Sequence, residues 1–246
     1  MGLERPDGKN QRADRLAPQC CEPELSPDGH RLAYSDVVVG GVAAPDVWIY
    51  DLDRDVRTRL TTDPASDAYP IWSPDGSQVV FRSGRQGAGA LYEKSVNGAV
   101  PEGVLLQSER GSVVARDWSL DGRWIAFEKF APGSQRDIWT LPLFGDRKPT
   151  PYLTSAFDEA LPALAPNGQW LAYVSNESGA DQVMVQSFPD PSRGKWQVST
   201  NGGTFPRWRR DGRELHYVGS DSRMMAVSVV TDTNFVVLAL GLEALR

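Results

Sequence analysis

The chain has 246 residues, of which 40% are hydrophobic, and its formal net charge is −6. This composition is typical of a globular protein, and the acidic balance argues against nucleic-acid binding, which requires a concentrated basic face. No apolar run reaches the roughly 18 residues that a membrane helix needs, so we expect no direct membrane insertion of this chain.

The N-terminal residues are polar and contain no apolar centre of the kind found in a signal peptide. Such a start would indicate the cytoplasm only for a complete gene product, and the repeats below favour a fragment. Cys20 and Cys21 are adjacent, a spacing that strains a disulfide and lacks the four ligands of a zinc site. With no P-loop or H-E-x-x-H sequence, we expect neither a metal nor a cofactor.

One turn sequence recurs from residue 25 onward. It first reads "LSPDGHRLAY", and the later copies are "WSPDGSQVVF" at 72–81, "WSLDGRWIAF" at 118–127, "LAPNGQWLAY" at 164–173 and "WRRDGRELHY" at 208–217. The five glycines are 47, 46, 46 and 44 residues apart. A fixed period in this range indicates a repeat architecture.

The residues of this turn have mechanical roles. Proline presets φ, Asp or Asn can bond its own backbone, and Gly accepts a positive φ. We therefore interpret the following residues as structural rather than catalytic: Asp28, Gly29, Asp75, Gly76, Asp121, Gly122, Asn167, Gly168, Asp211 and Gly212.

Each repeat contains four predicted strands. The first two flank the turn, because apolar residues alternate on both sides of it. The third strands are predicted at 46–52, 90–96, 137–143, 182–188 and 223–229, and the fourth at 57–61, 103–107, 150–154, 195–199 and 234–238. Four short strands in each repeat are typical of a propeller blade.

The fold class is therefore all-β, a β-propeller of four-stranded blades in one domain over residues 22–246. The blades are predicted at approximately 22–66, 67–112, 113–157, 158–202 and 203–240. Because one blade cannot bury both of its faces, we expect the blades to stack radially with aromatic side chains between them.

The pattern P-x-W-S-P-D-G, followed by Asp, an apolar residue and Trp or Tyr, resembles the PD40 (WD40-like) repeats of TolB-type propellers. True WD40 repeats begin with Gly-His and end with Trp-Asp, and the sialidase Asp-box has a residue between Asp and Gly; this chain shows neither pattern. The resemblance implies six blades. The five visible repeats are then part of a six-bladed propeller, and residues 1–21 are an outer-strand remnant of a preceding blade. The alternative is that the five blades close on themselves, with the N-terminal piece contributing a strand.

The sequence contains little that indicates catalysis. Only two histidines are present, His30 and His216, and the sequence contains no G-x-S-x-G motif, the nucleophile elbow of serine hydrolases. His30 is a turn residue, whereas His216 replaces a small apolar residue and is either a tolerated change or a ligand-facing one. Carboxylates such as Asp67, Asp117 and Asp158 leave a glycan-active propeller open, because glycosidases use two facing carboxylates. We predict no enzymatic activity in this chain.

Residues just before the first strand of each blade are expected near the mouth of the central channel. Charges there would steer a partner and aromatic rings would supply contact area, although these positions also fit ordinary polar loop ends. The candidate binding residues are Glu24, Asp67, Tyr69, Asp117, Asp158, Phe205 and Arg207.

The resemblance implies a protein or peptide ligand and a periplasmic or otherwise extracytoplasmic location. The run from "NGGTFPRWRRDGRELHYVG" to "MMAVSV" is most similar to the C-terminal propeller of bacterial serine/threonine protein kinases. This implies a sensor or scaffold module of a larger protein. The alternatives are a gating propeller of a prolyl-oligopeptidase-like serine peptidase, with its catalytic domain elsewhere, and a glycan-active propeller.

Overall fold

The computed structural model describes residues 21–36, 44–87, 89–131, 133–231 and 234–241, which form five sheets that we number as blades one to five. Blade one contains β1 (Cys21–Leu25), β2 (Arg31–Asp36), β3 (Asp46–Asp51) and β4 (Val56–Arg59). Blade two contains β5 (Asp67–Trp72), β6 (Gln78–Ser83), β7 (Ala90–Ser95) and β8 (Gly103–Gln107). Blade three contains β9 (Ser112–Trp118), β10 (Trp124–Phe130), β11 (Asp137–Pro142) and β12 (Thr150–Leu153).

Blade four contains β13 (Glu159–Leu164), β14 (Trp170–Ser175), β15 (Gln182–Ser187), the short 3₁₀ helix η2 (Pro191–Arg193) and β16 (Lys195–Gln197). Blade five contains β17 (Gly203–Trp208), β18 (Glu214–Gly219), β19 (Met224–Val230) and β20 (Val236–Gly241). In every blade each strand pairs with the strand that follows it in the chain. The sequence prediction of an all-β propeller with four-stranded blades is confirmed.

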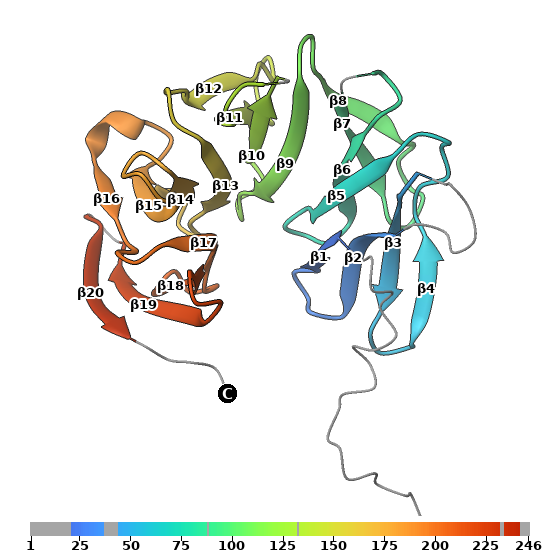
Figure 1. Cartoon of the computed structure of the whole chain (residues 1–246). Coiled ribbons are helices and arrows are strands. Elements are labelled where there is room, and N and C mark those ends of the chain that lie inside the picture. Colours follow the sequence, from blue (N-terminus) through green and yellow to red (C-terminus); the bar gives the residue numbers. More distant parts are fainter. Residues whose placement is uncertain (1–20, 37–43, 88, 132, 232–233, 242–246) are drawn as a thin grey trace, which may run out of the picture.

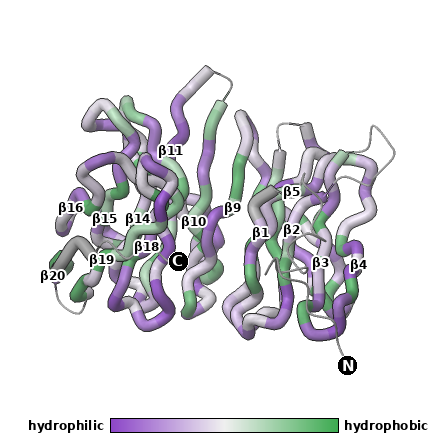
Figure 2. The backbone as a smooth tube through the Cα atoms, turned by 60° about the horizontal axis from the view of Figure 1, so that its bottom comes forward, coloured by the Kyte–Doolittle hydropathy of each residue, from purple (hydrophilic) through white to green (hydrophobic). Residues whose placement is uncertain are grey.

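The blades follow one another in chain order around an arc, with β1, β5, β9, β13 and β17 innermost (Figure 1). Hydrophobic residues lie within the strands, and hydrophilic residues occupy many of the connections (Figure 2). Within the residues described, no helix has the length and apolar character needed to cross a bilayer. Residues 1–20, predicted as an outer strand, lie outside the described residues, while Cys21 begins β1.

Four buried apolar clusters join consecutive blades. Between blades one and two, for example, Val47 and Ile49 belong to the same cluster as Trp72 and Phe81. Equivalent clusters lie between blades two and three, three and four, and four and five. Fully burying one such side chain contributes roughly 1.5–3 kcal/mol, so these interfaces supply most of the cohesion between blades.

Blade five meets blade one differently. None of the apolar clusters found among the described residues joins these two blades. Instead, Arg207 Nη2 lies 2.8 Å from Glu24 Oε1, and Arg210 Nη1 donates a hydrogen bond of 2.9 Å to the Pro27 carbonyl. The two ends of the arc are therefore linked by polar contacts, and a sixth blade remains a prediction.

The five repeated turns share one geometry. In each, the glycine N–H donates to the carbonyl three residues earlier, at 2.8–2.9 Å, and the Asp or Asn side chain accepts the N–H two residues later, at 3.0–3.1 Å. The glycines have φ between +67° and +78°. Non-glycine residues rarely adopt this region, because their Cβ then approaches the following carbonyl oxygen.

We predict that Gly122→Val lowers the free energy of unfolding by roughly 1–2 kcal/mol, the cost of a left-handed conformation for a residue with a Cβ. Gly122 has φ +74° and open space around its missing Cβ, so strain rather than a clash is tested. Gly103→Val is the matched control: it lies in β8, has no left-handed φ and also has open space. Urea unfolding of both variants checks this, and equal losses would contradict it.

Candidate functional site

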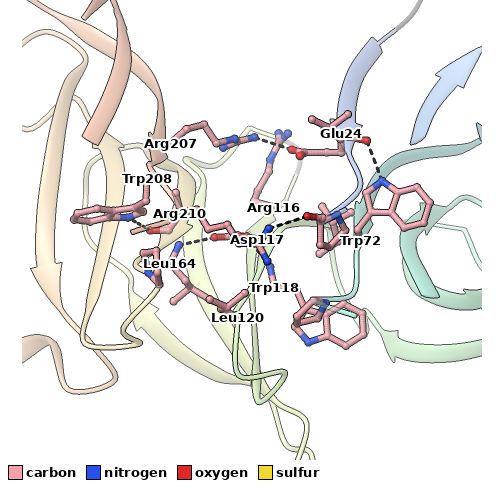
Figure 3. Close-up of a pocket in the computed structure, with 16 residues that line it drawn as sticks. Glu24, Trp72, Arg116, Asp117, Trp118, Leu120, Leu164, Arg207, Trp208 and Arg210 are labelled. Carbon is pink, nitrogen blue, oxygen red and sulfur yellow. Dashed lines mark hydrogen bonds and ion pairs between the residues drawn. The ribbon is translucent and has the colours of Figure 1, made fainter. Parts of the chain in front are cut away.

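A pocket of about 290 Å³ lies where the C-terminal ends of the innermost strands and their turns converge (Figure 3). We call it the axial pocket. All five blades contribute to it, with three indoles, several aliphatic side chains and the charged residues Glu24, Arg116, Asp117, Arg207 and Arg210. It is therefore a mixed apolar and charged surface built from parts of the chain that are distant in sequence.

A β-bulge in each innermost strand sets which side chain lines the pocket. The register shifts in β1, β5, β9, β13 and β17, and in three of these strands the bulged residue has a positive φ and precedes a proline: Tyr69, Leu161 and Phe205. Bulges re-aim side chains and are common near functional sites. In every blade the residue paired with the second strand just after the bulge lines the pocket: Glu24, Ile71, Asp117, Ala163 and Arg207.

Two of the three arginines that line the pocket are paired with carboxylates. Arg207 forms its ion pair with Glu24 across the seam between blades five and one (Figure 3). Arg116 lies 2.9 Å from the buried Glu128 carboxylate, and its guanidinium stacks over Tyr69 at 5.3 Å from the ring centroid. The Glu128 carboxylate also accepts a hydrogen bond of 2.7 Å from the Leu161 backbone, so this pair fixes blade three against blade four.

Asp117 occupies the centre of the charged group. Its carboxylate accepts hydrogen bonds from the backbone N–H groups of Leu164, at 2.6 Å, and Trp118, at 2.9 Å. Burial raises the pKa of this carboxyl to about 7; the negative Glu24 adds to the rise, whereas the two N–H donors and Arg207 oppose it. Its charge therefore changes near neutral pH, within the pocket wall.

The three indoles differ in what they bind. Trp72 Nε1 donates to the Glu24 carbonyl at 2.9 Å, and Trp208 Nε1 donates to the Ala163 carbonyl at 3.0 Å, so each joins its blade to the preceding one. Trp118 Nε1 instead donates to Gly122, in its own turn, at 3.3 Å. This bond stays within blade three, and the Trp118 ring also packs against the apolar cluster between blades two and three.

The predicted site residues separate into two groups. Glu24, Asp117 and Arg207 come together in the axial pocket. Asp67 does not reach a channel mouth: its side chain is 0% exposed and lies 2.8 Å from Arg85 Nη2. Asp158 accepts a 2.8 Å hydrogen bond from the Arg136 backbone and forms an ion pair with its guanidinium.

The two predicted aromatic residues lie beside the pocket rather than in its lining. Tyr69 is half-buried under Arg116, and Phe205 is 50% exposed. Sequence reasoning placed the mouth at the beginnings of the innermost strands, whereas the pocket forms at their ends and at the following turns. It therefore missed Trp118, Leu120 and Arg210. Leu120 and Arg210 could have been identified from the sequence, because they stand where the other three repeats have proline.

Each of the two histidines lies beside a carboxylate. His30 Nδ1 lies 2.7 Å from Asp53, and His216 Nε2 lies 3.1 Å from Glu214. In the part of the chain that the structure describes, neither ring bonds a Ser, Thr or Cys side chain, and no three His, Cys, Asp or Glu residues cluster as metal ligands would.

We predict that Asp117→Asn gains stability relative to wild type as the pH rises from about 5 to 7. Over this range the folded state keeps a proton on Asp117 that the unfolded chain has released, so unfolding of the wild type releases a proton and a rise in pH favours its unfolded state. Asp158→Asn is the control, because Arg136 holds the pKa of Asp158 below its usual range and both states are ionised throughout. Urea unfolding at several pH values measures both differences. A pH-independent difference for Asp117→Asn would contradict the prediction.

Comparison with known proteins shows where this architecture occurs. An uncharacterized protein of Agrobacterium fabrum is 30% identical over 206 residues, which cover 79% of this chain and 68% of that protein. The Tol-Pal system protein TolB of Francisella tularensis is 25% identical over 84% of this chain and 48% of its own length. The Tricorn protease homolog 1 of Streptomyces coelicolor is 33% identical over 110 residues, 44% of this chain but 10% of that protein.

Among solved structures, TolB from Acinetobacter baumannii has a TM-score of 0.68 and 20% identity, over 90% of this chain and 55% of that chain. This chain thus spans about half the length of the TolB proteins it matches. The family model of the TolB beta propeller domain, PD40, matches residues 7–209. This match covers most of the sequence and includes all five repeated innermost strands, so the chain belongs to the PD40, TolB beta propeller domain family.

Proposed function

We propose that this chain is a non-catalytic propeller that binds a protein or peptide in the axial pocket. The observation that carries the proposal is the convergence there of three indole rings and five charged side chains from all five blades. Trp and Arg dominate the energetics of protein–protein contacts, because they bury large areas and also supply hydrogen bonds. A propeller that served only as a spacer would not require this composition at its axis.

The size of the pocket favours a peptide segment. A volume of about 290 Å³ is at the lower end for ligand sites and accommodates one or two side chains rather than a folded domain. A partner protein would therefore insert an extended segment or a loop. The surrounding strand ends and turns, which include the half-exposed Leu25 and Leu120, would cover the flanking residues.

The carboxylates of the pocket are arranged for binding rather than for bond cleavage. Glu24 is engaged by Arg207, and Asp117 accepts two backbone N–H groups. A glycan-active propeller would use two facing carboxylates, one as acid and one as base or nucleophile. Both candidates here already have partners, so the glycan alternative receives no support from this geometry.

We further propose that the chain is an extracytoplasmic sensor or scaffold module of a larger bacterial protein, such as a receptor serine/threonine kinase. This follows the resemblance of residues 201–229 to kinase-linked propellers. The second candidate is a gating propeller of a serine peptidase, favoured by the match to the Tricorn protease homolog. Sequencing the genomic DNA on both sides of this reading frame separates them, by a kinase domain upstream or a G-x-S-x-G domain downstream.

Leu120→Glu is predicted to weaken peptide binding about tenfold or more, because it places a charge where an apolar contact is required. Peptides would be selected from a phage-displayed library of random linear sequences on wild-type protein, and their affinities measured by fluorescence anisotropy. Val56→Glu is the matched control, since Val56 is 50% exposed on the outer strand β4, away from the pocket. Failure to enrich any peptide, or equal affinity for Leu120→Glu, would refute binding at this pocket.

A further inference from the structure

We propose that the axial pocket selects a linear segment in which an Asp or Glu side chain pairs with Arg210 while a nearby bulky apolar side chain packs on Trp118 and Leu120. This inference rests on the proposed function and names the chemistry of the partner.

The second position of the repeated turn lines the axial pocket in every blade. Proline occupies this position in three blades, whereas Leu120 and Arg210 occupy it in blades three and five. The five residues form a ring around the pocket: Pro27, Pro74, Leu120, Pro166 and Arg210. Two of the five equivalent positions thus carry side chains with binding chemistry.

The two exceptions do not change the turn. The glycine N–H bond of the turn is 2.8 Å in blades three and five and 2.8–2.9 Å in the proline-containing blades. Gly122 and Gly212 have φ of +74° and +71°, within the range of the other three glycines. Local backbone geometry therefore does not require Leu120 or Arg210. What the two side chains change is the surface of the pocket.

Arg210 supplies the uncompensated positive charge. Its guanidinium extends from blade five across the pocket and donates to the neutral Pro27 carbonyl, rather than to a carboxylate (Figure 3). Arg207 and Arg116 are neutralised by Glu24 and Glu128, respectively. Of the three arginines lining the pocket, Arg210 alone forms no ion pair within the described part of the chain.

The carboxyl group of Asp117 cancels the positive charge of Arg210 only in part near neutral pH. Asp117 is the other charged residue of the pocket lining, and burial raises its pKa to about 7, so it is partly protonated there. A carboxylate brought by a ligand would complement Arg210 by a charge-assisted hydrogen bond, and Arg can bind it through two parallel N–H groups. The charge balance thus favours an acidic over a basic side chain.

Trp118 and Leu120 supply the apolar half of the site. Leu120 is 48% exposed. Trp118 is partly buried against the apolar cluster of blades two and three, but its indole donates its hydrogen bond within its own turn, unlike Trp72 and Trp208, which donate to the preceding blade. Both residues also line a second hollow of about 480 Å³ between the turns of blades two and three. An apolar side chain that packs on them can therefore lie between the two hollows, with the peptide continuing outward.

The test replaces Leu120 and Arg210, one at a time, by the proline that the other repeats have at this position. Arg210→Pro and Leu120→Pro keep a turn that the chain already forms with proline, and urea unfolding verifies that each variant is folded. Peptides enriched on wild type from a phage-displayed library of random linear sequences are synthesised with amidated C-termini, so that a side chain supplies the only carboxylate. Each is paired with its Glu→Gln or Asp→Asn analogue, and binding is measured by fluorescence anisotropy.

We expect the enriched peptides to share an acidic residue near a bulky apolar one. Arg210→Pro should weaken the acidic peptide about tenfold or more, which corresponds to one hydrogen bond to a charged group, and should leave the amide analogue nearly unchanged. Leu120→Pro should weaken both peptides to the same extent. Arg213→Gln, an exposed arginine of the same turn that does not line the pocket, should change neither affinity.

Two results would overturn this inference while the proposed function stands. One is enrichment of peptides that lack a carboxylate, and the other is an equal effect of Arg210→Pro on the acidic peptide and its amide analogue. If no peptide is enriched on wild type, the proposed function and this inference both fail.

Discussion

The packing of each blade against the next is the interaction on which the rest of this structure depends. A four-stranded sheet has two faces, and in blades one to four one face is buried against the following blade. Aromatic side chains at one position after the turn serve this purpose in four blades, where each lies in one of these clusters: Phe81, Phe127, Tyr173 and Tyr217. Tyr34, at the same position of blade one, is buried outside these clusters. Stability and radial arrangement therefore arise from the same side chains.

The same arrangement brings distant residues to one point. Because the innermost strands converge, the residue after each bulge and the second residue of each turn lie around a common axis. Two residues after the bulges, Ile71 and Ala163, also belong to the apolar interfaces. At the second position of the turn, the turn geometry tolerates different side chains. A repeat can thus keep its fold while individual copies acquire Glu24, Asp117, Arg207, Leu120 or Arg210.

The seam between blades five and one is both a contact between blades and a part of the axial pocket. It contains no apolar cluster in the described residues, and two arginines of the pocket extend across it. An exposed ion pair contributes little net stability, because solvent and salt screen it. Arg207 therefore contributes more by holding Glu24 in place within the pocket than by joining the blades, and Arg210 remains available to a ligand carboxylate.

The sequence by itself determined the blade. Strand alternation, the glycine spacing and the turn residues predicted β3, β7, β11 and β15 to within one residue, because these features depend on local backbone preferences and on a period that repeats. It also grouped Glu24, Asp117 and Arg207 among the candidate binding residues, and these three line the axial pocket. Tertiary structure alone decided that Asp67 is buried against Arg85 and that Asp158 is held by Arg136. It alone also showed that Leu120 and Arg210 face one pocket. The physical reason is that burial and charge pairing depend on the distance between blades, and residues some 45 positions or more apart carry no local signal of which partner will neutralise them.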